Sequence, residues 1–318
     1  MSLVIDHLHK RFGPVVALDG LAFEVPPGQV FGFLGANGSG KTTTMRIALG
    51  VLEPDAGQVT WRGTESHRLP RSTWGYLPEE RGLYPRMRVL DQLVFFASLH
   101  GVPPERAKRE ALASLHRFRA DDLAPRRAEQ LSKGNQQKVQ FIAATLHNPQ
   151  VLLMDEPFTG LDPVNTMLLR EAFLELRDRG HTVIFSTHQM DVAEALCESV
   201  AIVDRGRMVI GGPMREVRRA SGRRMVRVSV EGDHRLPWLA AVPGTRVIQA
   251  GMDRSTVELD EGIEPDAVLA AAVGAGARVT HFEIADPSLE QIFVDFVGRP
   301  PDEETHLAPA PDAAEDAA

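Results

Sequence analysis

The stretch GANGSGKTT, residues 35–43, has the residue types and the spacing needed to hold the phosphates of a nucleotide. It satisfies the pattern G-x-x-x-x-G-K-[ST], in which backbone amides wrap the phosphates, the lysine reaches the β- and γ-phosphates, and the hydroxyl binds Mg²⁺. We therefore expect a phosphate loop here, where an ordinary glycine-rich turn is the alternative. The expected nucleotide-binding residues are Gly35, Asn37, Gly38, Gly40, Lys41, Thr42 and Thr43.

Two adjacent carboxylates, Asp155 and Glu156, end the apolar run VLLMDE. At the end of a strand Asp155 can bind Mg²⁺ through water, and Glu156 can take a proton from an attacking water. Such pairs are common and can be solvated acidic turns. The upstream glycine loop favours a metal ligand at Asp155 and a catalytic base at Glu156.

A histidine, His188, ends the next apolar run, TVIFSTH (182–188). Ligands of open α/β sheets bind at the carboxyl ends of the strands, so an imidazole there could donate a hydrogen bond to the γ-phosphate. A surface or core histidine without a ligand is the alternative.

The stretch LSKGNQQKV (131–139) raises the possibility of a second phosphate site. Ser132 is expected to cap a helix, and Gly134 allows a ligand to approach the backbone closely. From this stretch alone, a capped helix without a ligand is an equal alternative.

The elements that carry these residues alternate between strands and helices. VFGFLG leads as a buried strand into the glycine loop, VLLMDE and TVIFSTH are further strands, and between them Leu169, Ala172, Phe173 and Leu176 share a helix face. This order predicts an α/β core of the P-loop NTPase type with a parallel sheet. Residues 88–130 have a helical pattern, interrupted by GVPP at 101–104, and predict an inserted helical lobe over about 88–145.

A second, smaller domain is expected after a change in composition at residues 211–224. Val226, Val228 and Val230 alternate with polar residues as in a half-buried strand, and TVELD repeats this pattern. A last amphipathic helix, capped by Ser288, is expected to bury Leu289, Ile292, Phe293 and Phe296. The predicted organisation is an ATPase-type domain at 1–220, a small α+β domain at 221–299, and a disordered acidic tail at 300–318.

The charge argues against nucleic acid as a partner. The formal net charge is -8, but residues 300–318 hold six acidic and no basic side chains, which leaves 35 basic and 37 acidic residues in the rest. A nucleic-acid-binding domain usually has a clearly basic surface. The single cysteine, Cys197, excludes a disulfide within the chain, and no segment reaches 18 consecutive apolar residues. We expect a chain that does not itself cross a membrane.

Taken together and in this order, the glycine loop, the helical lobe, LSKGN, LLMDE, TGLD and STH resemble the nucleotide-binding subunit of an ABC transporter over about residues 3–212. In that family two cassettes enclose two ATP molecules. The resemblance implies that Ser132 and Gly134 hold the γ-phosphate of ATP on the opposite chain. It also implies that Phe12 stacks on adenine, with a core position as the alternative, and that Asp162 couples the two sites.

Three positions depart from the family pattern. Glu79 stands where the family has Gln, and Lys133 and Asn135 stand where it has Gly and Gln. Glu79 can still bind Mg²⁺ or position water, but its charge would oppose the γ-phosphate. Lys133 could offset that charge from the other chain.

The segments GYLPEERGLYP, LSKGNQQK and DPSLEQIFVDFVG resemble the ATPases of bacterial sodium-extruding and drug-resistance exporters. That resemblance implies a pair of cassettes, either two copies or two different ones, and a separate membrane permease at the cytoplasmic face of the cell membrane. Leu83, Tyr84 and Met87 are candidates for the groove that receives the permease, unless they only pack the helical lobe. The alternatives are a soluble ABC-type ATPase not tied to transport and a monomeric P-loop GTPase or kinase.

Overall fold

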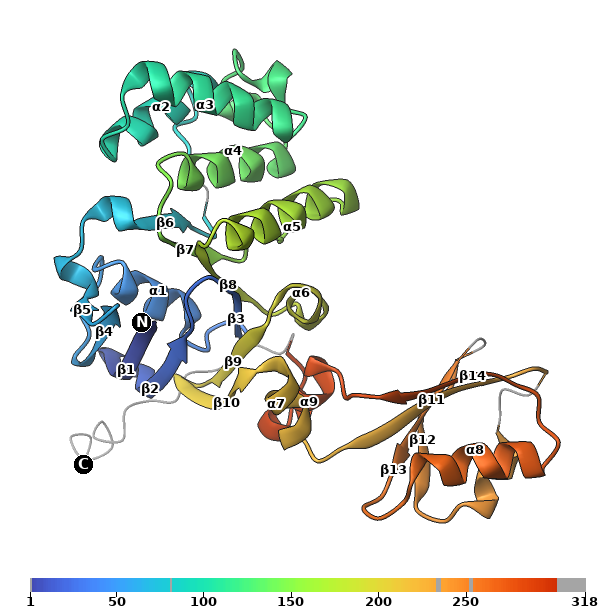
Figure 1. The fold of residues 1–318 in the computed structure, drawn as a ribbon. Coiled ribbons are helices and arrows are strands. Elements are labelled where there is room, and N and C mark those ends of the chain that lie inside the picture. The colour runs from blue at the N-terminus through green and yellow to red at the C-terminus, as the bar shows by residue number, and fades with distance from the viewer. Residues whose placement is uncertain (1, 81, 233–235, 252–253, 302–318) are drawn as a thin grey trace. The chain divides into compact units, whose positions relative to one another are not determined.

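The computed structural model describes residues 2–80, 82–232, 236–251 and 254–301 (Figure 1). The expected disordered tail therefore lies outside the described residues, except for Pro300 and Pro301. The described residues divide into two compact units, one within 2–214 together with 299–301, and one within 215–298. The domain bounds expected from the sequence remain a proposal.

A six-stranded sheet forms the centre of the first unit and has the order β10-β9-β3-β8-β7-β6. All neighbours are parallel except β10, which pairs antiparallel with β9. The strands are β3 (Val30–Leu34), β6 (Trp74–Leu77), β7 (Val151–Asp155), β8 (Thr182–Thr187), β9 (Ser199–Asp204) and β10 (Arg207–Pro213). Every residue of β3, β7 and β8 is buried, as expected for parallel strands covered on both faces. The predicted parallel α/β core is confirmed.

A second sheet, which the sequence did not predict as separate, has the order β2-β1-β4-β5. It consists of β1 (Leu3–Phe12), β2 (Val15–Val25), β4 (Ala56–Trp61) and β5 (Thr64–Glu65). Only part of β1, β2 and β4 is buried, because the sheet packs one face on the core, and β5 has no buried residue.

Three helices, α1 (Lys41–Ala48), α5 (Pro163–Asp178) and α6 (Met190–Leu196), accompany the central sheet. The helical lobe consists of α2 (Val89–Leu99), α3 (Pro104–Arg117) and α4 (Lys133–Thr145), with α2 and α4 in contact (Figure 1). The buried stripe of α2 is centred on Val89, Leu93 and Ala97.

Residues 118–130 were expected to be helical but form only the short 3-10 turns Asp121–Leu123 and Ala128–Gln130. The reason is local, because Arg119 has a left-handed backbone and Pro125 offers no N–H for a helix. Two further 3-10 turns are Ser66–Arg68 and Arg71–Thr73.

The second unit has an antiparallel sheet of order β12-β13-β11-β14. Its elements are β11 (Arg224–Val230), a 3-10 turn (Pro237–Ala241), β12 (Thr245–Gln249), β13 (Ser255–Leu259), α8 (Pro265–Gly274), β14 (Val279–Ala285) and α9 (Leu289–Val297), preceded by α7 (Met214–Ala220). Val226 and Val228 are buried in its core, as predicted. Ser288 caps α9 as expected, but Phe296 is 44% exposed rather than part of the buried face.

No helix among the described residues is long and apolar enough to span a bilayer.

Candidate active site

The phosphate loop connects the buried strand β3 to α1. Two of its glycines are required because a side chain at either position would clash with the backbone. A Cβ atom on Gly35 would lie 2.2 Å from the carbonyl oxygen of Val203, and one on Gly40 would lie 2.7 Å from that of Ala17. Gly40 also has a left-handed backbone, with φ of +105°. The loop therefore packs too tightly for any side chain at these two positions.

Lys41 spans the loop from within. Its side chain is almost fully buried, and Nζ donates hydrogen bonds to the carbonyl oxygens of Gly35 (2.7 Å) and Ala36 (3.0 Å). Burial lowers the pKa of the ammonium, and the nearby carboxylates of Glu156 and Asp155 oppose that shift. A buried cation within a glycine loop at the start of a helix is suited to binding phosphate.

A cavity of about 360 Å³ collects most of the predicted residues. Its lining comprises Ala17, Asn37, Gly38, Gly40, Lys41, Thr42, Thr43, Glu79, Asp155 and Glu156. They lie together because β3 and β7 are parallel strands of one sheet. The loop follows the carboxyl end of β3, and the two carboxylates lie at the carboxyl end of β7, on the same side of the sheet.

The residues expected to hold Mg²⁺ suit a hard cation. Asp155 is 1% exposed; Oδ1 accepts a hydrogen bond from Ser186, whereas Oδ2 is buried without a partner among the described residues. Partial burial and the charges of Asp155 and Glu156 raise the pKa of Glu79. Within the described residues no three His, Cys, Asp or Glu side chains converge as a complete metal site. Thr42, Glu79 and Asp155 nevertheless offer oxygen ligands, and Mg²⁺ commonly completes its shell with water and phosphate oxygens.

Glu156 is held on both carboxylate oxygens. Oε1 accepts a hydrogen bond from the backbone N–H of His188 (3.1 Å) and lies 2.9 Å from Nδ1 of that ring. Oε2 accepts hydrogen bonds from the hydroxyls of Thr159 (3.2 Å) and Thr187 (3.2 Å). Because Nδ1 of His188 is engaged, the predicted contact of this ring with the γ-phosphate would fall to Nε2. Thr159 and Thr187 were missed in the sequence, where they were only polar residues in TGLD and STH.

Ser132, Gly134 and Asp162 do not line this cavity. Ser132 is exposed and caps α4 as predicted, since Oγ accepts a hydrogen bond from the amide of Asn135 (3.3 Å). Asp162 caps α5 through the amide of Asn165 (2.9 Å), and a Cβ on Gly134 would lie 3.2 Å from Nδ2 of Asn165. These residues form a second, exposed region.

Phe12 does not line the cavity either. It is 49% exposed at the end of β1, which makes the alternative core position wrong. Lys10 lies over its ring, with Nζ 5.7 Å from the centroid. An exposed ring remains suited to stacking on a base.

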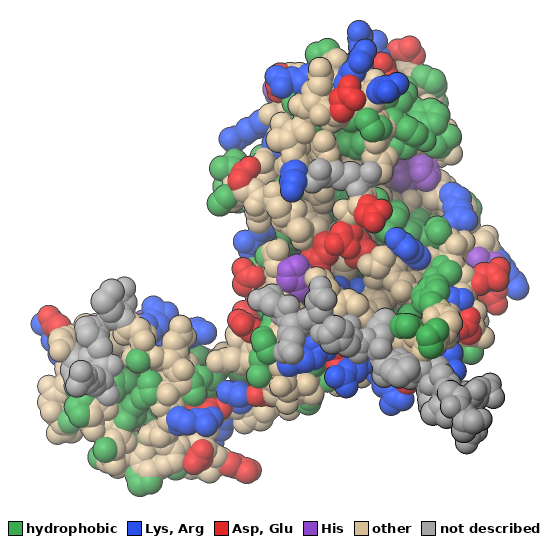
Figure 2. Space-filling model, turned by 180° about the vertical axis from the view of Figure 1, so that it is seen from behind, with side chains coloured by type: hydrophobic (Ala, Val, Ile, Leu, Met, Phe, Trp, Pro, Cys, Tyr) green, Lys and Arg blue, Asp and Glu red, His purple; other side chains and the backbone are tan. Residues whose placement is uncertain are grey.

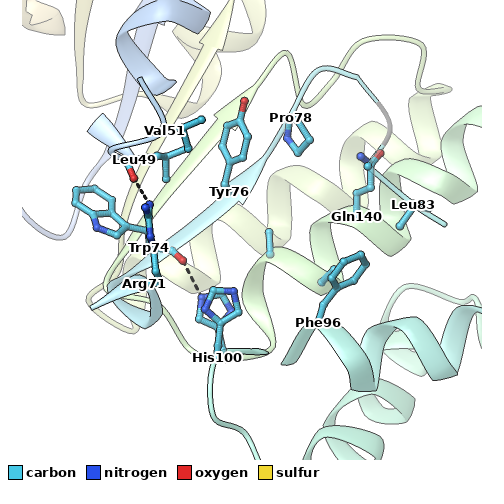
Figure 3. Close-up of a pocket in the computed structure, with 14 residues that line it drawn as sticks. Leu49, Val51, Arg71, Trp74, Tyr76, Pro78, Leu83, Phe96, His100 and Gln140 are labelled. Atoms are coloured by element: carbon cyan, nitrogen blue, oxygen red, sulfur yellow. Dashed lines mark hydrogen bonds between the residues drawn. The ribbon is translucent and has the colours of Figure 1, made fainter. Parts of the chain in front are cut away.

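A second cavity, of about 320 Å³, lies between β6 and the helical lobe (Figure 3). Its lining is mainly apolar and includes Trp74 and Tyr76 from β6, and Phe96 from α2. Of the three residues expected at a groove, Leu83 lines it, whereas Tyr84 and Met87 do not. Figure 2 shows hydrophobic side chains gathered on the outer surface of the helical lobe beside a histidine.

Both the N-terminal and the C-terminal part of the chain resemble known protein families. Residues 18–159 match the family model for the ABC transporter, and residues 212–297 match the C-terminal domain of DrrA1-3-like ATP-binding proteins. The chain is 42% identical to the ABC transporter ATP-binding protein YhaQ of Bacillus subtilis (strain 168), over 93% of this chain and 98% of that protein. The chain belongs to the ABC transporter ATP-binding proteins. As a member of this family it binds and hydrolyses ATP and serves a transporter with a membrane partner.

Two further ABC proteins show the extent of the likeness. The linearmycin resistance ATP-binding protein LnrL of Bacillus subtilis (strain 168) is 28% identical over 93% of this chain and 98% of that protein. A solved ATP-binding subunit of an ABC transporter superposes with a TM-score of 0.65 at 30% identity, covering 70% of this chain and 94% of the other.

Proposed function

We propose that this ABC protein powers an exporter, and that it works as one of two cassettes that close head to tail on two ATP molecules. The observation that carries this proposal is the separation of its two phosphate-facing regions. Lys41, Asp155 and Glu156 line one cavity, whereas Ser132 is exposed elsewhere on the chain. A second cassette would bring its own Ser132 and Gly134 to that cavity. Export is supported by the similarity to a protein named for linearmycin resistance.

In this proposal the polar residues at and beside the cavity have different tasks. Lys41 and the loop amides bind the phosphates. Thr42, Glu79 and Asp155 would hold Mg²⁺, which would supply positive charge to offset that of the transferred phosphoryl group. Glu156 takes a proton from water as the water oxygen bonds to the γ-phosphorus and the bond to ADP breaks. His188 orients the carboxylate through its two contacts with Oε1.

The two cassettes close when ATP bridges them and open when hydrolysis removes the γ-phosphate. Asp162 couples the two sites, and Phe12 stacks on adenine. The pair acts at the cytoplasmic face of the membrane on a separately encoded permease.

The second cavity is proposed as the groove that receives a permease segment. Besides its apolar wall it offers Gln140 Oε1, His100 Nδ1 and His147 Nδ1, which are buried and have no hydrogen-bond partner among the described residues. The two imidazole rings stack with centroids 3.8 Å apart. Nε2 of His147 lies 2.8 Å from the carbonyl oxygen of Trp74, so it carries the proton and Nδ1 is an acceptor. The entering segment would therefore present a hydrogen-bond donor within an apolar face.

The test of pairing is the Glu156→Gln protein, which should bind ATP without turning it over. We expect size-exclusion chromatography to give a dimer only when ATP is present. The control Glu156→Gln/Ser132→Ala should remain largely monomeric with ATP. A Glu156→Gln protein that stays monomeric at saturating ATP would refute the paired-cassette proposal and favour a simple P-loop enzyme.

A further inference from the structure

The catalytic carboxylate is held by two different parts of the chain. Thr187 and His188 lie at the end of β8, a fully buried strand in the middle of the central sheet. Thr159, which shares Oε2 with Thr187, belongs instead to the loop that follows β7. One oxygen of Glu156 is thus bound at the same time by the rigid sheet and by a loop.

That loop leads within three residues to Asp162. Phe158 anchors its start, since the ring is 4% exposed and packs on Phe173 with centroids 5.2 Å apart. Beyond this anchor, Gly160 has a left-handed backbone with φ of +73°, and no atom lies within 4 Å of a Cβ placed there. The loop is therefore open around Gly160, whereas its start is packed.

The far end of the loop adjoins the exposed region. Both carboxylate oxygens of Asp162 accept hydrogen bonds from Asn165. The backbone N–H of Asn165 donates to Oδ1 (2.9 Å), and its side-chain Nδ2 donates to Oδ2 (2.5 Å). A Cβ atom placed on Gly134 would in turn lie 3.2 Å from Nδ2 of Asn165. Asp162 thus contacts Asn165, near Gly134, and stands only three residues along the chain from Thr159, which binds Glu156.

Glu156 itself has a strained backbone. Its φ is +47°, in the left-handed region that residues other than glycine rarely adopt. Such strain is found where the surroundings hold a side chain in a functional position. The hydroxyl of Thr159 belongs to those surroundings.

We propose that Thr159 is a positioning residue that keeps Oε2 of Glu156 engaged until a second cassette contacts the Asp162 loop. The inference rests on the proposed pairing of cassettes. When the loop shifts, the Thr159 hydroxyl leaves Oε2, and that oxygen becomes available to accept the proton of the attacking water. Thr187 and His188 stay in place and keep the carboxylate oriented.

The test is a double-mutant cycle in the full-length chain, in which kcat and KM for ATP are measured. Thr159→Val removes the hydroxyl at nearly constant shape; we expect it to raise kcat roughly threefold or more, with KM unchanged, whereas Thr159→Ser should behave like the native chain. Asp162→Asn retains a helix cap and should lower kcat roughly tenfold in the native chain. In the Thr159→Val chain the same change should cost less than about twofold, because the loop no longer holds the base.

Equal losses from Asp162→Asn in both chains, or no loss in either, would overturn the inference, as would a lower kcat in Thr159→Val. A measurement without turnover separates this from a purely structural role. Glu156→Gln/Thr159→Val should dimerise with ATP as readily as Glu156→Gln, and loss of that dimer would also overturn it. If Glu156→Gln alone fails to dimerise, the proposed pairing fails instead.

Discussion

The two phosphate-facing segments of this protein start two helices in different ways. α1 begins at Gly40, which has no side chain to cap it, so the first amides remain for a ligand. α4 begins at Ser132, whose hydroxyl already binds the amide of Asn135. The first segment also holds a buried lysine, whereas Lys133 in the second is exposed. In the proposed pairing, a loop that binds the ligand of its own chain therefore differs from a surface that would meet a ligand carried by a second chain.

The largest effect should come from exchanging the lysine in each segment. Lys41→Met removes the buried cation of the cavity and should lower ATP hydrolysis at least ~100-fold, because phosphoryl transfer depends on electrostatic stabilisation. Lys133→Met, the matched control, should keep ATP binding by the single chain. Phosphate release and titration with a fluorescent ATP analogue measure both. Normal ATP affinity in Lys41→Met would show that the first segment does not hold the phosphates.

Substitutions of one glycine in each segment should distinguish ATP binding by a single chain from the pairing of two chains. Gly40→Ala would bring Cβ to within 2.7 Å of a backbone oxygen, and the distorted loop should bind ATP roughly tenfold or more weakly. Gly134→Ala would bring Cβ to 3.2 Å from Nδ2 of Asn165 and 3.6 Å from Cδ2 of Leu161, both side-chain atoms, and should leave ATP binding by one chain intact. In the Glu156→Gln background it should abolish the ATP-dependent dimer. The distinction between the segments is lost if both substitutions weaken ATP binding by a single chain equally.

How far the sequence could predict each segment depended on the distance over which its contacts form. The phosphate loop and the Asp155–Glu156 pair lie in contiguous runs, so their spacing could be read directly. The hydrogen bond from Thr159 to Glu156 depends on side-chain geometry, and the stacking of His100 on His147 joins the end of α2 to the segment after α4. The predicted burial of Phe296 was wrong for a similar reason. Periodicity predicts which residues share a helix face, but it does not predict which other part of the chain covers that face.

The departure at Glu79 offers a smaller test of the first segment. Its cavity holds the carboxylates of Glu79, Asp155 and Glu156 with the single buried lysine, so Glu79→Gln removes one repulsive charge. We expect ATP to bind about threefold to tenfold more tightly, with a changed hydrolysis rate. The same substitution in a Lys133→Gly chain asks whether Lys133 compensates from the partner, since compensation would make the two effects non-additive. Unchanged affinity, rate and pairing in Glu79→Gln would exclude a role for this charge.

The smallest expected effect is on stability and concerns the contacts that hold α4 in place. α1 is held by the buried strand that directly precedes it, whereas α4 has no such strand before it. Just past the end of α4, His147 bonds the backbone of β6 through Nε2, and burial lowers the pKa of its ring from 6.5 to about 4. The unfolded chain therefore binds more protons than the folded chain between about pH 6.5 and pH 4. The contribution of the neutral His147 ring to the free energy of unfolding is complete above pH 6.5 and is lost as the pH falls toward 4. After allowance for solvent screening, the free energy of unfolding should fall by about 1 kcal/mol between pH 7 and pH 5 because of this residue. Urea unfolding of the native chain and of His147→Gln at both pH values isolates that difference. An equal pH dependence in the two chains would mean that this histidine does not anchor the second segment through its neutral ring.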